Sequence, residues 1–288
     1  MAPLFGPAGN EKGFSAAGYK DIDSVPEYLT PFGLDAYEFQ GGHGIRITEE
    51  RARRFGEKCR AAGITLSVHA PYYISMSSAE EEKRKNSIGY IIGAARAASW
   101  MGAGHVVVHT GSCGKMTREQ ALGLSKDTFG KALAALDDEG LGEITICPET
   151  MGKINQLGTA EEVVEICRMD DRLLPCIDFG HLNARTFGTL KTRADFEKIF
   201  DIIENGLGRD RLLRFHSHFS KIEYTLKGGE KNHLTFADTV FGPDFEPLAE
   251  LVYKKGCSPT FICESAGTQA EDAAAMKKIY EKAAGISE

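Results

Sequence analysis

The sequence predicts an α/β protein with the (β/α)8 TIM-barrel fold, and three observations favour this fold class. Short runs of β-branched and apolar residues alternate with longer segments of helical periodicity. There are eight such runs, the number of strands in a closed parallel barrel. No Pro/Gly/Ser-rich linker divides the 288 residues, so residues 1–288 are predicted to form a single domain.

Each predicted strand is a short apolar segment. In chain order, the segments are 3–9, 36–42, 64–72, 105–112, 144–150, 174–181, 212–220 and 260–265. Residues 87–104 and 117–140 repeat apolar side chains every three or four positions and stop at glycine, and 271–284 gives a final helix. Such helices are the crossovers that parallel strands need. A doubly wound open sheet is the alternative, but the GxGxxG motif common after its first strand is absent.

Composition excludes several classes of protein. No apolar run is long enough to span a membrane, and the N-terminus lacks the features of a signal peptide, so we expect a cytoplasmic protein that does not bind membranes. The seven cysteines are odd in number and form no CxxC motif, which argues against a disulfide framework. The net charge of −7 does not indicate nucleic-acid binding, although a local basic face remains compatible with it.

Metal-ligand residue types end six consecutive predicted strands, from the third to the eighth. They are His69, His109, Glu149, Asp178 with His181, His216 with His218, and Glu264. A single polar residue at a strand end is common, but six ends with only His, Asp and Glu are hard to assign to chance. Because the carboxyl ends of barrel strands converge on one face, these side chains are predicted to meet in space.

A divalent metal centre is the simplest way to stabilise such a cluster. Carboxylates and imidazoles packed together repel one another or become protonated unless a cation neutralises them. The mixture of nitrogen and oxygen ligands suits Zn²⁺, Mn²⁺ or Fe²⁺ better than Mg²⁺ or Ca²⁺. The candidates outnumber the roughly four ligands that one ion needs, so the sequence predicts at least two ions, an arrangement that serves phosphodiester hydrolysis.

Six motifs in this order resemble the endonuclease IV family, the zinc-dependent apurinic/apyrimidinic endonucleases of DNA base-excision repair. They are SVHAPYYISMSS, VVVHTGS, PETMGKINQLG, CIDFGH, FHSHFSK and ICES. The resemblance covers roughly residues 60–265. It implies a hydrolase within the xylose isomerase-like superfamily of barrels that cleaves DNA 5′ to abasic sites, and we expect a monomer.

The resemblance also implies roles for individual residues. The implied zinc ligands are His69, His109, Glu149, Asp178, His181, His216, His233 and Glu264. Glu149 is implied to bridge two of the ions, and Glu149 and Glu264 flank the position of the attacking water. Tyr72 matches a tyrosine that inserts into DNA near the lesion. Further candidates for substrate contact are Arg46, Lys231 and Arg185.

The sequence departs from the family pattern on loops and at the third metal site. Lys231 stands where the family has an aspartate ligand, and the Asn-Pro-Arg segment after the second strand is replaced by GGHGIR, in which Arg46 is the nearest substitute. Glu230 is one residue from Lys231, and strand alternation predicts that its side chain points away. The expectation is two tightly bound ions and a third site that is empty or weakly filled, with Lys231 supplying positive charge to a substrate phosphate.

Two other classes of function remain open. A sugar isomerase or epimerase resembling xylose isomerase needs one divalent metal, and Glu149, Asp178, His216 and Glu264 would supply its ligands. The additional histidines favour the phosphodiesterase, because a mononuclear sugar enzyme has no use for them. A barrel that has lost catalysis and acts as a binding module would be expected to lack a bridging ligand, and none is missing.

Overall fold

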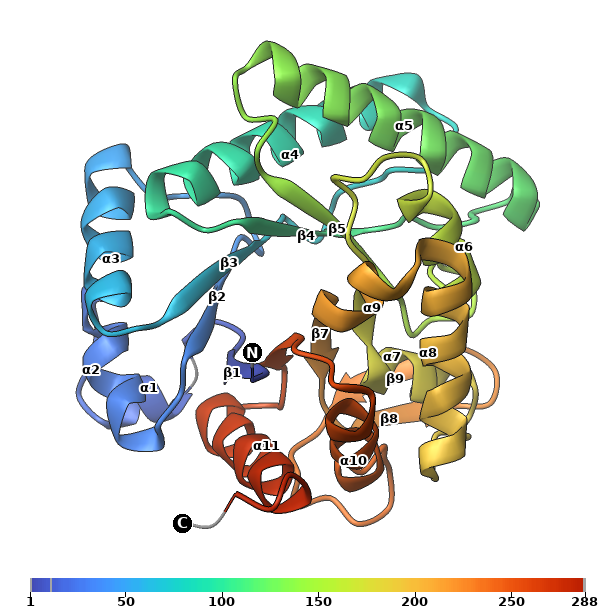
Figure 1. The fold of residues 1–288 in the computed structure, drawn as a ribbon. Coiled ribbons are helices and arrows are strands. Elements are labelled where there is room, and N and C mark those ends of the chain that lie inside the picture. The colour runs from blue at the N-terminus through green and yellow to red at the C-terminus, as the bar shows by residue number, and fades with distance from the viewer. Residues whose placement is uncertain (1, 11, 287–288) are drawn as a thin grey trace.

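Eight parallel strands surround the centre of the molecule, and helices cover them on the outside (Figure 1). The computed structural model describes residues 2–10 and 12–286. The barrel strands are β1 (Leu4–Pro7), β2 (Ala36–Gln40), β3 (Thr65–His69), β4 (His105–His109), β5 (Thr145–Glu149), β6 (Cys176–Asp178), β7 (His216–Phe219) and β10 (Thr260–Cys263). The predicted (β/α)8 barrel is confirmed, since all eight strands lie in the predicted segments.

The sheet closes between its first and second strands. Its hydrogen-bonded order runs from β1 through β10 and β7 to β2, and a parallel bridge between Ala8 and Glu38 joins the two ends. Gly6 makes this approach possible, because a Cβ at that position would lie 1.8 Å from the carbonyl oxygen of Ala36. Only a residue without a side chain fits there.

Helices occupy most of each of the three predicted helical segments, 87–104, 117–140 and 271–284. In chain order, the helices are α1 (Lys12–Ala16), α2 (Val25–Leu29), α3 (Glu49–Ala61), α4 (Glu81–Met101), α5 (Arg118–Asp138), α6 (Ala160–Cys167), α7 (Phe179–Arg185), α8 (Arg193–Leu207), α9 (Arg209–Arg214), α10 (Glu246–Lys255) and α11 (Gln269–Ala283), with 3-10 turns at Ile22–Ser24 and Thr30–Phe32. Thr117 and Gln120 form a capping box at the start of α5, and α4 stops at the left-handed Gly102.

Every barrel strand is shorter than its predicted segment, and two of these differences affect the residues of the site. Helix α9 occupies Arg209–Arg214, so β7 begins at His216 rather than near Leu212. Strand β6 ends at Asp178 and α7 begins at once, which places His181 on a helix. Asp178 accounts for this boundary, because its Oδ1 accepts a 2.7 Å hydrogen bond from the amide of His181 and caps the helix.

A two-stranded antiparallel hairpin after β7 is absent from the strands expected from the sequence. It consists of β8 (Ile222–Thr225) and β9 (Gly229–His233) and lies beside α7. A bridge between Lys153 and Gly229 also ties it to the loop that follows β5. These contacts bring the hairpin to the carboxyl end of the barrel strands.

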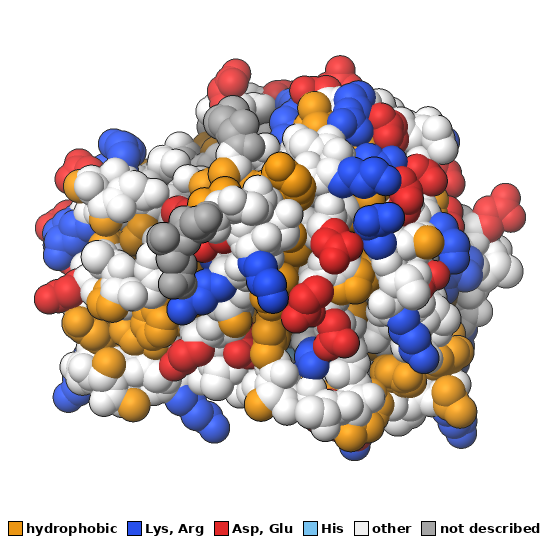
Figure 2. Space-filling model, turned by 60° about the horizontal axis from the view of Figure 1, so that its bottom comes forward, with side chains coloured by type: hydrophobic (Ala, Val, Ile, Leu, Met, Phe, Trp, Pro, Cys, Tyr) orange, Lys and Arg blue, Asp and Glu red, His pale blue; other side chains and the backbone are white. Residues whose placement is uncertain are grey.

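The cysteines and the surface agree with the compositional analysis. All seven cysteines are buried and unpaired, as expected for a protein without a disulfide framework. No helix among the described residues is long and apolar enough to cross a membrane. On the side shown in Figure 2, acidic and basic side chains are intermingled.

Candidate metal centre

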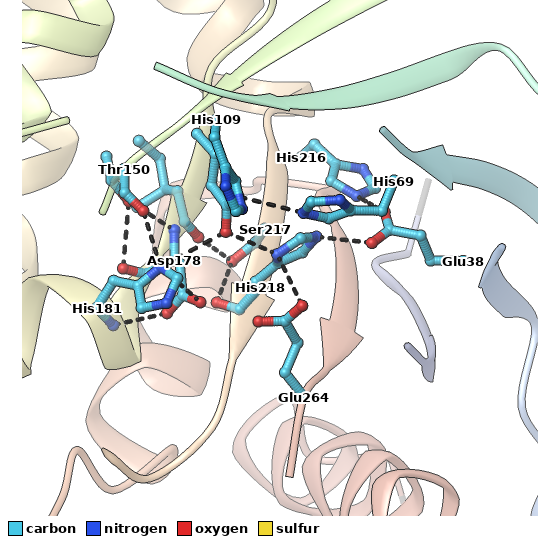
Figure 3. Close-up of polar contacts among 12 residues, drawn as sticks. Glu38, His69, His109, Thr150, Asp178, His181, His216, Ser217, His218 and Glu264 are labelled. Carbon is cyan, nitrogen blue, oxygen red and sulfur yellow. Dashed lines mark hydrogen bonds and ion pairs between the residues drawn. The ribbon is translucent and has the colours of Figure 1, made fainter. Parts of the chain in front are cut away.

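Glu149, at the end of β5, lies at the centre of the cluster. Its Oε2 is 3.4 Å from Nε2 of His69 and 3.3 Å from Nε2 of His109. Its Oε1 is 3.0 Å from Nδ1 of His218. The carboxylate therefore faces two imidazoles with one oxygen and a third with the other, which is the geometry a bridging ligand needs. Figure 3 shows the rings of His69, His109 and His218 near one another.

A second group of ligand atoms adjoins the first through Glu149. One ligand atom each from Glu149, Asp178, His218 and Glu264 lies within 4.8 Å of the others. Three of these side chains come from the ends of different barrel strands, and Glu264 follows the last strand directly. The structure thus brings together residues that are far apart in sequence, as the strand-end pattern predicts.

The described residues fit a bound cation. Glu149 Oε2 and Asp178 Oδ2 are buried, and neither accepts a well-aligned hydrogen bond from the described residues. Their nearest partners are imidazole nitrogens, 3.3 Å from Glu149 Oε2 at His109 and 3.2 Å from Asp178 Oδ2 at His181. Buried carboxylate oxygens are costly without a donor or a cation. Their place among several imidazole nitrogens is consistent with ligands to divalent metal.

Backbone carbonyls fix the orientation of two histidines. Nδ1 of His69 lies 2.7 Å from the carbonyl oxygen of Ala70, and Nδ1 of His181 lies 2.9 Å from that of Thr150. A carbonyl oxygen only accepts, so each Nδ1 carries a proton and each Nε2 is left to face the centre. This is the usual way in which a protein selects the nitrogen that binds a metal.

A third group of ligand atoms contains Glu230, contrary to the expectation from strand alternation. His181, Glu230 and His233 each place a ligand atom within 4.8 Å of the other two, and Glu230 Oε2 is 3.6 Å from His181 Nε2. In the hairpin, Glu230 pairs with Tyr224 and Asn232 with Glu223, which leaves Lys231 without a cross-strand partner. This β-bulge shifts the alternation by one residue, so Glu230 and His233 share a face.

Lys231 lies outside the centre for the same reason. Its Nζ is 2.6 Å from Glu223 Oε1, and its side chain is about half exposed. The role predicted for Lys231, a positive charge that replaces a third metal, does not agree with this position. The residue before it, Glu230, places a carboxylate where an anionic ligand could act.

The two histidines of β7 lie at different depths in the barrel. His218 is in register with Asp178, whereas His216 is in register with Cys176, one layer further from the mouth. His216 Nε2 contacts Glu38 Oε2 at 3.0 Å, and it is His218 that contacts Glu149. The sequence could not separate the two, because residues two apart on a strand point to the same side.

A cavity of about 350 Å³ opens above the centre. Its lining includes His69, His109, Glu149 and Glu264. Tyr72 stands at its edge with a 53 % exposed side chain, and its hydroxyl lies 3.2 Å from Nδ1 of His43. The volume is in the range of small-molecule or single-nucleotide sites.

The predicted arginines differ in their positions. Arg46 is exposed on the loop after β2. Arg185 points to the loop after β5, where it donates hydrogen bonds to the carbonyl oxygens of Met151 and Gln156. Arg185 therefore holds this loop in place, and it is the loop's own Lys153 that lines the cavity.

The histidines of the centre differ in proton affinity. Burial lowers the pKa of His69 and His181, but neighbouring carboxylates outweigh it and raise both values to about 9, Glu149 acting on His69 and Asp178 on His181. Burial lowers the pKa of His109 to about 4.

Burial also lowers the pKa of His218, but Cys176 and the neighbouring carboxylates, Glu38 first among them, outweigh it and raise the value. At neutral pH the metal-free protein is thus expected to hold protons on His69, His181 and His218 that a metal must displace.

Metal binding at all positions is therefore expected to release about three protons per chain near pH 7. Below pH 9 the association constant of each ion that displaces one of these protons should rise with pH, by up to about one log unit per pH unit. The stability that these protonated histidines give the metal-free protein is present below pH 6.5 and lost as pH approaches 9. Zinc titrations with a pH indicator and melting curves of metal-free protein between pH 6 and 9 test both statements.

Glu38 is absent from the candidates expected from the sequence, Glu230 is expected there to point away, and His218 is grouped with the other strand ends but given no ligand role. Glu38 is fully buried on β2, although it lies in the apolar run AYEFQ. A carboxylate at an inward position of such a run is a detectable signal. No comparable signal marks Glu230, because its direction depends on the bulge.

The fold and this cluster define a class of protein, a (β/α)8 barrel with a histidine- and carboxylate-rich centre at the carboxyl end of its strands. Residues 27–283 match the xylose isomerase-like TIM barrel family, and the chain belongs to that family. An uncharacterized protein of Methanocaldococcus jannaschii is 33 % identical over 263 residues, which cover 91 % of this chain and 93 % of the relative. A probable endonuclease 4 of Thermoplasma acidophilum is 26 % identical over 210 residues, 70 % of this chain and 71 % of the relative.

Solved structures of two kinds share the fold. Endonuclease IV from Thermus thermophilus superimposes with a TM-score of 0.69 at 17 % identity, covering 99 % of this chain and 100 % of the other. A D-tagatose 3-epimerase-like protein gives a TM-score of 0.72 at 21 % identity, covering 98 % and 97 %. At these identities the likeness concerns the fold alone, so the choice between the two chemistries depends on the site.

Proposed function

We propose that this protein is a metal-dependent phosphodiesterase of the endonuclease IV type that cleaves DNA 5′ to abasic sites. The proposal rests mainly on one observation: two groups of ligand atoms contain Glu149, and a third adjoins them through His181, whose Nδ1 is 3.5 Å from Glu149 Oε1, so there are more ligands than a single ion can use. The similarity to probable endonuclease 4 proteins supports the same function.

The ligands divide among three positions. We assign His69, His109 and Glu149 to the first position, and Glu149, Asp178, His218 and Glu264 to the second, with His218 in place of His216. His181, Glu230 and His233 form the third. Zinc suits this mixture of imidazole and carboxylate, and Mn²⁺ or Fe²⁺ is chemically compatible with it.

Bound divalent ions would supply Lewis acidity that activates water and stabilises charge on the leaving oxygen. The protein must also orient the nucleophile. Glu264 lines the cavity. In the metal-free protein, burial opposes ionisation of its carboxyl, but the positive charge of His218 outweighs burial and lowers the pKa. Bound cations would favour the ionised form in the same way. An ionised Glu264 at the cavity can accept a hydrogen bond from the attacking water and hold it in position.

Lys153 is the proposed contact to the substrate phosphate. It lines the cavity, is exposed, and has no ion-pair partner within residues 2–10 and 12–286. Its loop is fixed from two sides, since Arg118 and Arg185 both donate to the carbonyl oxygen of Gln156. A cation held in this way can pair with a phosphate oxygen without a large loss of loop entropy.

A nicking assay combined with metal analysis tests the function directly. Zinc-loaded protein should cut a duplex with one abasic site on the 5′ side of the lesion and leave the undamaged duplex intact. Protein stripped of metal should be inactive, and zinc should restore cleavage. Absence of cleavage at the abasic site by protein with a full complement of zinc would rule the proposal out.

The Tyr72→Ala variant should bind an abasic duplex more weakly than the wild type. The half-exposed ring lies at the edge of the cavity, where it can stack on a base next to the lesion. We expect a loss of about 1 to 3 kcal/mol, the range for stacking on an aromatic side chain. Fluorescence anisotropy with labelled duplex measures it, and Tyr253→Ala, at a 52 % exposed tyrosine on α10, is the matched control.

A sugar epimerase is the second candidate, because Glu149, Asp178, His218 and Glu264 alone could hold one ion. The resemblance of the fold to a D-tagatose 3-epimerase-like protein is consistent with it. This candidate predicts about one tightly bound metal per chain, no affinity for abasic DNA, and epimerisation of a ketose. The same metal analysis and binding assay therefore separate the two candidates.

A further inference from the structure

Glu38 is a buried carboxylate that none of the three proposed metal positions uses. It lies on β2, one layer below the cavity, and is fully inaccessible to solvent. An ionised side chain in such a place is costly unless several donors surround it. The contacts of Glu38 show which groups offset this cost and how the carboxylate affects those groups.

Four polar groups converge on the two oxygens of Glu38. Oε2 accepts a 2.9 Å hydrogen bond from the hydroxyl of Ser67 and lies 3.0 Å from Nε2 of His216. Oε1 accepts a 3.1 Å hydrogen bond from Nε2 of Gln40 and lies 3.1 Å from Nε2 of His218. Figure 3 shows the carboxylate pointing toward the rings of His216 and His218.

The contact with His218 links this deeper layer to the metal centre. Nε2 of His218 is buried and makes no well-aligned hydrogen bond among the described residues. Its ion-pair partner is Oε1 of Glu38, at 3.1 Å. On the other edge of the ring, Nδ1 lies 3.0 Å from Glu149 Oε1 and 3.5 Å from Glu264 Oε1. One imidazole thus spans a buried carboxylate below and the ligand carboxylates above.

This arrangement selects the nitrogen of His218 that faces the centre. A carboxylate can only accept, so Glu38 favours the form of the ring with a proton on Nε2. In the metal-free protein Nδ1 also faces a carboxylate, that of Glu149, and donates to it. A metal bound between His218 and the ligand carboxylates would replace the proton on Nδ1, while Glu38 retains the proton on Nε2. His69 and His181 are oriented by main-chain carbonyls, whereas His218 is the one of these three that uses a side-chain carboxylate.

We propose that Glu38 is a positioning residue of the metal centre, which orients His218 through its Nε2–H and makes its Nδ1 a stronger metal ligand. The inference rests on the proposed metal centre, but not on DNA as its substrate. A carboxylate behind a metal-binding histidine raises the basicity of the ring, and removal of such a partner typically weakens metal binding about 10- to 100-fold.

His216, in the layer below, also contacts Glu38. It shares the Glu38 carboxylate with His218 and is fully buried, so it holds the carboxylate in position without reaching the centre. This gives a reason for two histidines at alternate positions of β7. His216 orients the Glu38 carboxylate, and the carboxylate in turn orients His218.

The Glu38→Gln variant tests the proposal with a change of one atom. The amide can present an NH₂ group where His218 needs an acceptor, so the ring loses its fixed orientation. Competition with a chromophoric zinc chelator should show the tightest zinc binding weakened about 10- to 100-fold. Ser67→Ala, which removes a different donor to Glu38, is the matched control and should bind zinc within about threefold of wild type. Zinc affinity of Glu38→Gln within about twofold of wild type would overturn the proposal.

A measurement on the wild-type protein keeps the test decisive if Glu38→Gln does not fold. Long-range ¹H–¹⁵N correlation spectra of the zinc-loaded protein report which nitrogen of His218 carries the proton. The proposal expects the proton on Nε2, and a proton on Nδ1 would contradict it. Neither readout involves DNA, so the orientation of His218 and the proposed nuclease function can fail separately.

Discussion

Glu149→Gln is expected to reduce turnover by at least about 10²- to 10³-fold while the protein remains folded. The carboxylate stands between His69 and His109 on one side and His218 on the other. Its negative charge can offset two cations at once, whereas an amide is neutral and offsets none. The nicking assay on an abasic duplex measures the loss, and metal analysis should show fewer ions bound.

The control for this substitution is Glu139→Gln. Glu139 carries the same functional group, but it is exposed and paired with Arg96 on the outside of the barrel. The control should retain wild-type activity. Glu149→Gln protein with activity within about tenfold of wild type would contradict a bridging role and, with it, the two-metal mechanism.

Saturation with zinc followed by removal of free metal is expected to leave about three equivalents per chain. This differs from the two expected from the sequence, and the reason is Glu230. His181 and His233 are neutral ligands when they bind a metal, so the Glu230 carboxylate supplies the anionic charge of the third position. Glu230→Gln should reduce the stoichiometry by about one equivalent.

Lys231→Gln is the matched control, because it changes the adjacent residue, which points toward Glu223. Its stoichiometry should equal that of the wild type. Elemental analysis of dialysed protein gives both values. Two equivalents in the wild type with no change in Glu230→Gln would mean that the three side chains form only a hydrogen-bonded cluster.

The fold could be predicted from the sequence because it depends on patterns that repeat along the chain. Runs such as HVVVH and TFIC are too apolar to be exposed, and the helices between them stop at glycines or begin at Thr caps. The hairpin after β7 could not be predicted in this way. Its strand GEKNH is polar and short, so it lacks the alternation that marks a strand.

The candidate centre was partly predictable for a related reason. A parallel barrel gathers the ends of all its strands, so His69, His109, Glu149, Asp178 and Glu264 are expected at one mouth once the fold is known. The structure also brings His181 and His233 to this mouth. Their implied ligand roles stay predictions until metal is measured.

The sequence by itself determined the order of the strands and the types of residue at their ends, because both are local properties of the chain. The depth of each side chain within the barrel and the direction in which it points were decided only by the tertiary structure. The start of β7 at His216 sets His218 level with Asp178, and a single bulged residue in β9 turns Glu230 inward and Lys231 outward. Each depends on pairing with another strand, and one residue of register is enough to exchange the side chain that faces the centre.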